Sequence, residues 1–440
     1  MGKPSRKRCQ TPAEWKHDCR ESGLWEENIM TNATHIHAGT GKRALVLVFL
    51  AAIIEGFDLQ AAGVAVPKLV SAFGLSPSQL GVFLSSATFG LVVGALCGGV
   101  IADRFGRRNG LALSLVVFGL FSIGTAFSDT FEHLVVMRFL TGVGLGGALP
   151  NLIAIAAESV SPERRGRAVA IMYAGVPLGG ALASLIALLG LHDDWGSIFL
   201  VGGILPLLLV LPLQMMMGPF RVIRDAKAPA RRRDVLMAPG ALPQTLLLWA
   251  GFFFGLIVVY LLLNWLPQIL VSLGFARETA SMVQIVFNIG GAAGAVIGGR
   301  LLDGSRPAFS AALCFMGLIL AITSLALLPA GNVAAALAAG TFVGATVIGV
   351  QALLYGIAPQ CYPSEVRGTG VGLAVSVGRL GSIVGPLVAG WLLASGMGPQ
   401  QLLYTLLPIA AICGATTVVL ILHRSGKARQ EQSGGPERLT

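Results

Sequence analysis

The chain alternates between long apolar stretches and short polar loops over most of its 440 residues. Twelve stretches are long enough to cross the hydrocarbon core of a bilayer as helices. A longer polar segment, residues 218–242, separates the first six from the second six. We therefore predict an all-α integral membrane protein of two six-helix bundles. The predicted spans are 44–66, 79–101, 110–128, 133–157, 167–190 and 196–217, then 243–266, 279–302, 308–328, 332–358, 368–393 and 400–422.

The two sets of six spans are related by an internal repeat. Residues 94–99 are Gly-Ala-Leu-Cys-Gly-Gly, and residues 294–299 are Gly-Ala-Val-Ile-Gly-Gly. Asp103 is matched by Asp303 at the same offset, and the Arg-Gly pair at 165–166 returns at 367–368. Such a repeat predicts two pseudo-symmetric bundles with a binding site between them near the bilayer midplane.

Composition and charge agree with a membrane protein. Only 12% of the residues are charged, about half of the ~25% that is usual in soluble proteins. The net charge is +10, but fifteen of the 31 Lys and Arg residues lie in one alternating set of loops and two in the other. This asymmetry follows the positive-inside rule and argues against a nucleic-acid partner. It predicts a bacterial inner-membrane protein with both termini in the cytoplasm.

We expect five segments along the chain. A cytoplasmic tail at 1–43 precedes a bundle at 44–217, a linker at 218–242, a second bundle at 243–422 and a cytoplasmic tail at 423–440. The first tail has no apolar core of a signal peptide. Met30 would begin a shorter tail, so an overextended start is an open alternative.

Several kinds of chemistry are not indicated. The six cysteines have neither metal-ligand nor disulfide spacing. Residues 142–147 match a dinucleotide fingerprint, but no strand precedes them, so we interpret their glycines as a helix-packing face. We expect no metal, no cofactor and no enzymatic activity.

Two motifs lie in the first half: Gly94-(x)3-Gly98-Gly99-(x)3-Asp103-Arg104-Phe105-Gly106-Arg107-Arg108 at the end of the second span and Arg138-(x)3-Gly142-x-Gly144 in the fourth. Both resemble motifs of the major facilitator superfamily. The loop after the second span is similar to its signature loop, and the fourth span carries a similar helix 4 motif. Three shorter segments, residues 55–58, 150–154 and 378–382, look like the aromatic acid:proton symporter branch, and most like its hydroxyphenylpropionate permeases.

The resemblance implies a major facilitator fold that imports a small aromatic carboxylate with protons by alternating access. It implies a role in aromatic hydrocarbon catabolism and a monomer as the functional unit. One alternative is a proton-driven efflux antiporter of the same fold, although exporters usually have adjacent Gly and Pro in helix 5 and here Val176 separates Gly175 from Pro177. Another is a receptor that senses aromatic acids, although the short tails contain no recognisable signalling domain.

Two acidic residues are the candidates for proton coupling. Glu55 and Asp58 lie near the middle of the first span with i, i+3 spacing, which places them on one helix face. A charged group at this depth costs on the order of 2.5–3.5 kcal/mol. The pair therefore needs a cavity, a partner or a proton, and a structural hydrogen-bonding pair is the alternative.

Two intramembrane arginines are candidates for substrate binding. Arg379 lies about 11 residues into the eleventh span, or ~17 Å from its start at 1.5 Å per residue. Its guanidinium matches the geometry of a carboxylate, but it could also be the fixed partner of Glu55 or Asp58. For Arg138 in the fourth span, an inter-helix ion pair or snorkelling to the surface is an equal alternative.

Other polar or aromatic residues lie within spans, where helix packing is the commoner role. Asn151 and Trp265 are the strongest further candidates for substrate contact, ahead of Tyr173, Tyr355, Asn264, Asn288 and Gln351. Charged residues at the cytoplasmic helix ends are predicted to form a conformational latch of ion pairs that open and close in the transport cycle. The latch residues are Asp103, Arg104, Arg107, Arg108, Glu158, Arg165, Glu365 and Arg367, with Glu163 beside them.

Overall fold

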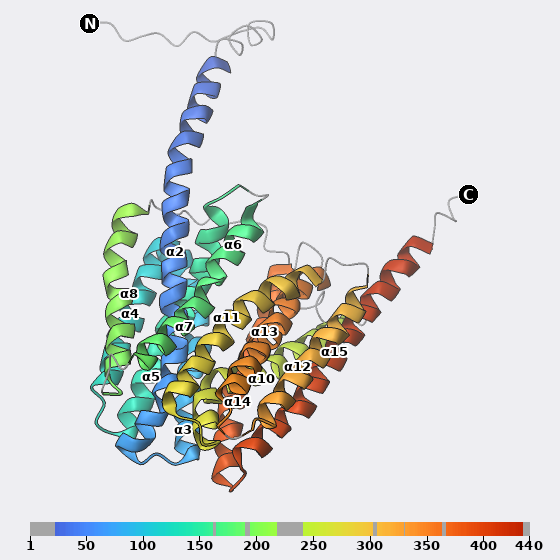
Figure 1. Ribbon diagram of the computed structural model, residues 1–440. Helices are drawn as coiled ribbons and strands as arrows, with labels where there is room; N and C mark the ends of the chain where they lie inside the picture. The colour runs from blue at the N-terminus through green and yellow to red at the C-terminus, as the bar shows by residue number, and fades with distance from the viewer. Residues whose placement is uncertain are drawn as a thin grey trace, which may run out of the picture.

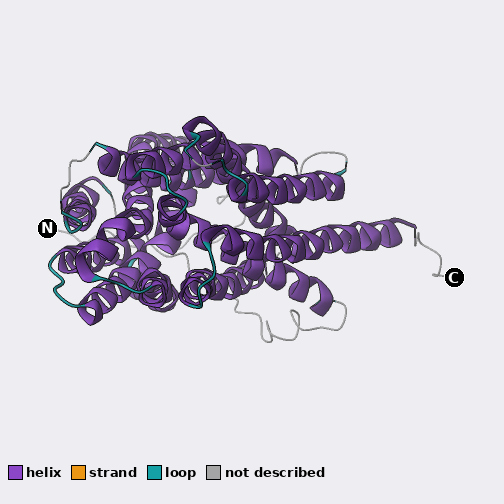
Figure 2. Cartoon of the chain, turned by 60° about the horizontal axis from the view of Figure 1, so that its bottom comes forward, coloured by secondary structure: helices purple, strands orange, loops and turns teal. Residues whose placement is uncertain are grey.

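The computed structural model describes residues 23–161, 164–189, 194–217, 241–301, 306–329, 331–362 and 367–433 (Figure 1). Side chains are described within these ranges except at residues 23–40, 99–100, 103, 165–167, 170, 299–301, 367–369 and 426–433. Every regular element in the described ranges is a helix, as Figure 2 shows. They supply twelve segments long and apolar enough to cross a membrane. The predicted all-α fold with twelve spans is thus confirmed.

The helices divide evenly between the two halves of the chain. The first half contains α2 (Gly23–Phe73), α3 (Pro77–Phe105), α4 (Arg107–Ala126), α5 (Phe131–Glu158), α6 (Arg165–Tyr173), α7 (Gly175–Leu188) and α8 (Ser197–Met216). The second half contains α10 (Leu242–Ser272), α11 (Arg277–Leu301), α12 (Pro307–Ala326), α13 (Val333–Ile357), the 3-10 helix η2 (Ala358–Cys361), α14 (Arg367–Ala394) and α15 (Pro399–Ser433).

Two helices are longer than their apolar stretches. α2 begins at Gly23, inside the predicted tail, and continues past Pro67 to Phe73, where Gly74 takes a positive φ of 63°. α15 continues to Ser433, inside the other predicted tail. Hydropathy marks only the part of a helix that lipid surrounds, so polar extensions at either end escape it. The predicted linker at 218–242 lies almost wholly outside the described residues.

The fifth span is divided into α6 and α7 at Ala174. Pro177 lies just beyond the break. Proline has no backbone N–H to donate to the carbonyl of Tyr173, and its ring crowds that carbonyl. The sequence therefore interrupts the helix at Tyr173, a residue that faces the other half of the protein.

In each half, glycines allow one pair of helices to pack closely. Cβ atoms at Gly90, Gly94 or Gly98 of α3 would collide with the backbone of α5. At the repeat-related positions, Cβ atoms at Gly290, Gly294 or Gly298 of α11 would collide with the backbone of α13. Small residues are what close helix approach in a membrane requires. The sequence repeat is therefore also a repeat of packing.

The two ends of the protein can be named from the helix termini. We call the linker end the one where α8 ends at Met216 and α10 begins at Leu242, and the far end the opposite one. In Figure 1 the linker end is at the top, and the start of α2 and the end of α15 extend beyond it. The α3–α14, α7–α11 and α2–α10 pairs join the two halves.

Candidate functional site

Asp58 of α2 belongs to a sealed ion pair inside the first half. Arg138 Nη1 of α5 donates to Asp58 Oδ2 at 2.8 Å and to Oδ1 at 3.1 Å. The Ser122 hydroxyl of α4 donates to the same Oδ1 at 2.9 Å, and the Arg138 guanidinium lies 5.3 Å from the ring centre of Phe199 in α8. Four helices therefore meet around this pair.

Burial determines what the Asp58–Arg138 pair can do. The side chains are 0% and 1% exposed, so neither group is open to a solute in this conformation. Removing one partner of such a pair leaves an uncompensated buried charge, at about 3–5 kcal/mol. Arg138 therefore forms an inter-helix ion pair, which the sequence had left open as an alternative to substrate binding.

Glu55 lies one turn from Asp58 but has different surroundings. It is buried, and its Oε2 has no hydrogen-bond partner among the described residues. Its charge interacts with Arg379 of α14, in the other half of the protein. Gly56 brings this part of α2 close to α7, because a Cβ there would overlap the carbonyl of Val176. Glu55 therefore faces the interface between the halves, while Asp58 faces into the first half.

Arg379 is the positive centre of that interface. Its Nη1 donates a hydrogen bond of 2.5 Å to the Tyr260 hydroxyl of α10, and its guanidinium carbon lies 5.8 Å from the Tyr260 ring centre. Glu55, Tyr173 and Tyr355 are its other electrostatic neighbours. A cation that is only partly buried and has no carboxylate in hydrogen-bond contact among the described residues can accept an anionic ligand.

Aromatic rings from both halves lie on the linker side of Arg379. Tyr173 of α6 and Tyr355 of α13 have ring centres 6.2 Å apart, and Tyr355 meets Phe252 of α10 edge to face at 5.2 Å. Tyr173 is 37% exposed. Rings in such arrangements offer flat apolar surface and edges to an aromatic guest.

Sequence reasoning placed Tyr173 and Tyr355 among the lesser candidates and missed Tyr260. A tyrosine in an otherwise apolar span was the available signal. Its hydrogen bond to Arg379 spans 119 residues of chain, which no local pattern indicates.

The structure places Asn151 and Trp265 away from Arg379. Asn151 donates to the Gly147 carbonyl at 2.9 Å, one turn back on α5, and packs against Gly110 of α4 inside the first half. Trp265 is 1% exposed and lies five residues beyond Tyr260, toward the far end. Its Nε1 has no hydrogen-bond acceptor among the described residues.

The far end is closed by contacts between the halves. Gln60 of α2 exchanges hydrogen bonds of 2.8 Å with Asn288 of α11, and Gln284 of α11 donates to Gln60 Oε1 at 2.8 Å. We call these three buried amides the amide cluster. Nearby, the Ser85 hydroxyl of α3 donates to the Ile383 carbonyl of α14 at 2.9 Å. The described conformation is therefore shut on the far side of Arg379.

Part of the predicted latch lies in the described residues. Arg107 Nε and Glu158 Oε1 form an ion pair of 2.9 Å between α4 and α5, and Arg108 donates to the Met217 carbonyl at 2.9 Å. Arg104 lies over the ring of its neighbour Phe105 at 5.4 Å. The ion pair and the hydrogen bond join elements of the first half, while the Arg104–Phe105 contact lies within α3. The Asp103, Arg165, Glu365 and Arg367 side chains and residue Glu163 lie outside the described residues.

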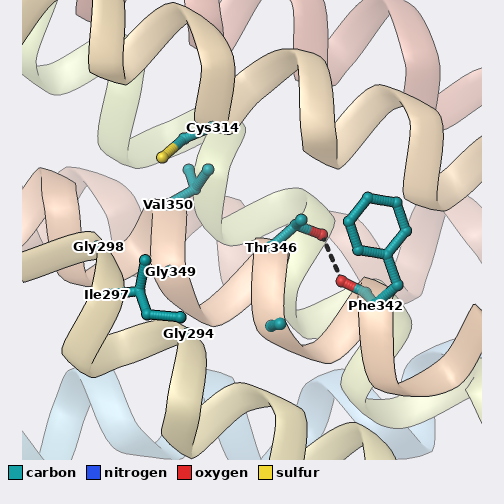
Figure 3. A pocket seen from close by; sticks show the side chains of 9 residues that line it. Gly294, Ile297, Gly298, Cys314, Phe342, Thr346, Gly349 and Val350 are labelled. Carbon is teal, nitrogen blue, oxygen red and sulfur yellow. Dashed lines mark hydrogen bonds between the residues drawn. The ribbon is translucent and has the colours of Figure 1, made fainter. Parts of the chain in front are cut away.

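A separate cavity opens between α11, α12 and α13 (Figure 3). Its lining is apolar apart from Cys314 and Thr346, and the Thr346 hydroxyl donates to the Phe342 carbonyl at 2.9 Å. It contains no charged side chain, so it is a poor site for an anion. The described residues contain no group of three His, Cys, Asp or Glu side chains that could hold a metal.

Paired helix bundles with a charged site between them define a secondary transporter. The sequence matches the Major Facilitator Superfamily over residues 48–379 and, overlapping, 248–439. The chain belongs to this family, as its loop and helix 4 motifs predicted.

Several transporters are similar to this chain in sequence. The 3-(3-hydroxy-phenyl)propionate transporter of Escherichia coli K12 is 42% identical over 86% of this chain and 94% of its own length. The gallate transporter of Pseudomonas putida is 34% identical over 86% and 91%. The benzoate transport protein of Acinetobacter baylyi is 31% identical over 87% and 90%. These relatives confirm a transporter and not an enzyme.

Solved structures agree on the fold. A D-xylose-proton symporter matches with a TM-score of 0.68 and 18% identity, over 87% of this chain and 96% of its own. A bacterial homologue of the lysosomal transporter Spinster, in an inward-facing conformation, matches with a TM-score of 0.65 and 18% identity, over 90% and 98%. At this identity the likeness concerns the fold alone.

Proposed function

We propose that this chain imports a small aromatic carboxylate together with protons across the bacterial inner membrane. The sequence relatives are named for transport of such acids. The basic loops favour a cytoplasmic linker end, with both termini on that side. The interface site lies between the two halves of the chain, and a monomer as the functional unit is part of this proposal.

The observation that carries the proposal is the environment of Arg379. Its guanidinium lies between the halves, held by Tyr260 and flanked by the rings of Tyr173 and Tyr355. A guanidinium presents paired donors to a carboxylate, and the adjoining rings suit an aromatic body. The site thus matches both parts of an aromatic acid.

In this proposal, proton coupling arises because Glu55 and the substrate carboxylate pair with the same arginine, Arg379. When Glu55 is ionised it neutralises Arg379, and the empty carrier can change conformation without a net charge at this site. When a substrate carboxylate takes Arg379, Glu55 must be protonated, or the interface would hold an excess negative charge at membrane depth. One proton then accompanies each monoanion.

Asp58 has a structural role in this proposal. Its bond to Arg138 keeps a neutral unit inside the first half throughout the cycle, so Glu55 is the better proton carrier of the two predicted acids. Alternating access requires the amide cluster to separate while the linker end closes. The latch residues whose side chains are not described, Asp103, Arg165, Glu365 and Arg367, are proposed to form their contacts in that second state.

A transport assay tests the proposal. The purified full chain in proteoliposomes should concentrate labelled 3-(3-hydroxyphenyl)propionate, the compound named for its 42% identical relative, on the alkaline side of an imposed pH gradient. An antiporter would move it toward the acidic side. Phenylpropionamide, which lacks the carboxylate, should not compete. Competition by the amide as strong as by the acid would contradict the proposal.

A further inference from the structure

Gln351 of α13 is a buried polar side chain with no assigned role. It is 8% exposed, and neither its amide nitrogen nor its amide oxygen has a hydrogen-bond partner among the described residues. Other buried amides in the described spans are engaged: Asn264 donates to the Tyr260 carbonyl at 2.8 Å, and Gln60 belongs to the amide cluster. Among the buried amides described, Gln351 alone lacks a partner on both atoms.

Helix geometry places Gln351 at the interface site. It precedes Tyr355 by four residues, so the two share one face of α13, about 40° apart at 100° per residue. Tyr355 on that face contacts Tyr173 of the other half. Gln351 lies ten residues from the end of η2 at Cys361, and Arg379 lies twelve residues from the start of α14 at Arg367, both counted from the linker end. The two side chains are therefore at similar depth.

The amide complements a group that Arg379 does not recognise. A primary amide offers donors and an acceptor, and a phenolic hydroxyl offers one donor and an acceptor, so the two can pair reciprocally. A carboxylate only accepts, and would leave the amide oxygen facing negative charge. Amide recognition and guanidinium recognition therefore suit opposite ends of one molecule.

We propose that Gln351 binds a hydroxyl group on the substrate ring and makes the transporter selective for hydroxylated aromatic acids. This inference rests on the proposed function, with the carboxylate on Arg379. It extends that function from aromatic acids in general to those with a polar ring substituent. The relatives named for hydroxyphenylpropionate and gallate fit this class, and the one named for benzoate does not.

The test compares two ligands that differ by one hydroxyl. Binding of 3-(3-hydroxyphenyl)propionate, the compound of the 42% identical relative, and of phenylpropionate is measured on the purified full chain, in the parent and in Gln351→Leu. The parent should prefer the hydroxylated acid. Gln351→Leu should lose about tenfold in affinity for it and retain the parent's affinity for phenylpropionate, because only the hydroxyl loses a partner.

Matched variants separate this role from a structural one. Gln351→Met keeps the side-chain volume and replaces Gln351→Leu in the test if the leucine variant folds poorly. It should show the same selective loss of affinity for the hydroxylated acid. Gln360→Leu makes the same chemical change at an exposed position beyond α13 and should leave the preference unchanged. Equal loss for both acids in the Gln351 variants, or an unchanged preference, would overturn the inference and leave the proposed function standing. A parent that binds neither acid would overturn the proposed function itself.

Discussion

At the scale of single residues, the two intramembrane arginines differ in what neutralises them. Arg138 is bound to Asp58 at 2.8 Å in a site closed to solutes. Arg379 is bound to the neutral hydroxyl of Tyr260 and interacts with Glu55 at longer range. The second arrangement leaves Arg379 without a carboxylate in hydrogen-bond contact among the described residues, whereas the first gives Arg138 one, so we propose separate roles for the two arginines.

Replacing Arg379 tests its role as the anion site. Arg379→Ala should abolish measurable binding of the aromatic acid. Arg379→Lys should restore it only weakly, because an ammonium cannot reproduce the paired donors or the position over Tyr260. Equilibrium binding of labelled acid measures both, and Arg306→Lys, at the exposed start of α12, is the matched control. Undiminished binding in Arg379→Ala would move the anion site elsewhere.

Breaking the Asp58–Arg138 pair should affect stability first. Asp58→Asn leaves Arg138 uncompensated, at an expected cost of about 3–5 kcal/mol, and should lower the melting temperature in detergent. The double variant Asp58→Asn, Arg138→Leu removes both charges and should recover most of that stability and some substrate exchange.

The same double variant distinguishes the two acids as proton carriers. If Asp58 carries the proton, the double variant should exchange substrate but fail to concentrate it. If Glu55 carries it, whatever transport returns should still be driven uphill by a pH gradient.

The sequence predicted Glu55 and Asp58 as a functional pair, but it did not predict that the two side chains face different parts of the protein. Residues three apart on a helix point about 60° from each other. Whether both face one cavity therefore depends on how α2 packs, and here α4 and α5 take Asp58 while α14 takes Glu55. Asn151 and Trp265 show the same limit, since family likeness in a segment does not tell which way its side chains point.

At the scale of helices, the amide cluster is the far-end contact most open to test. Three amides, each at most 3% exposed, bond across α2 and α11 in this state and must part for the far end to open. Gln60→Leu removes the central member and leaves Asn288 and Gln284 short of a partner. This variant should favour the state that is open at the far end, which is the outer side in the proposed orientation.

Alkylation of a cysteine at Ser85 measures that shift. Ser85 is 3% exposed and bonds across the halves, so Ser85→Cys, with native cysteines replaced, should react slowly with an impermeant maleimide added outside cells. Adding Gln60→Leu should raise the rate several-fold, while Gln360→Leu should not. An unchanged rate would mean that the amide cluster does not hold the far end shut.

The spans themselves were predictable because lipid imposes one solution on the backbone. Apolar length, charged loops and the glycine repeat all follow from that constraint and appear directly in the sequence. The ends of α2 and α15 could not be predicted, because a polar helix outside lipid has the same hydropathy pattern as a loop. The contact between the halves through the amide cluster could not be predicted either, because Gln60 and Asn288 are 228 residues apart in the sequence.

At the scale of the whole molecule, the proposed mechanism requires each transporting state to be neutral at the interface site. In the proposed mechanism, the empty carrier moves with Glu55 ionised beside Arg379, and the loaded carrier moves with Glu55 protonated and a substrate anion on Arg379. Each net charge moved through the full potential would contribute ~2.3 kcal/mol per 100 mV. A monoanion with one proton moves none, so uptake should respond to a pH gradient and not to potential.

The most direct test applies the two driving forces separately to proteoliposomes containing the parent chain or Glu55→Gln. In the parent, a pH gradient alone should concentrate the aromatic acid, and a potassium diffusion potential alone should not. Glu55→Gln mimics a permanently protonated residue, so it should exchange labelled for unlabelled acid but not accumulate it under either force. Accumulation by Glu55→Gln to the parent's level under a pH gradient would contradict the account.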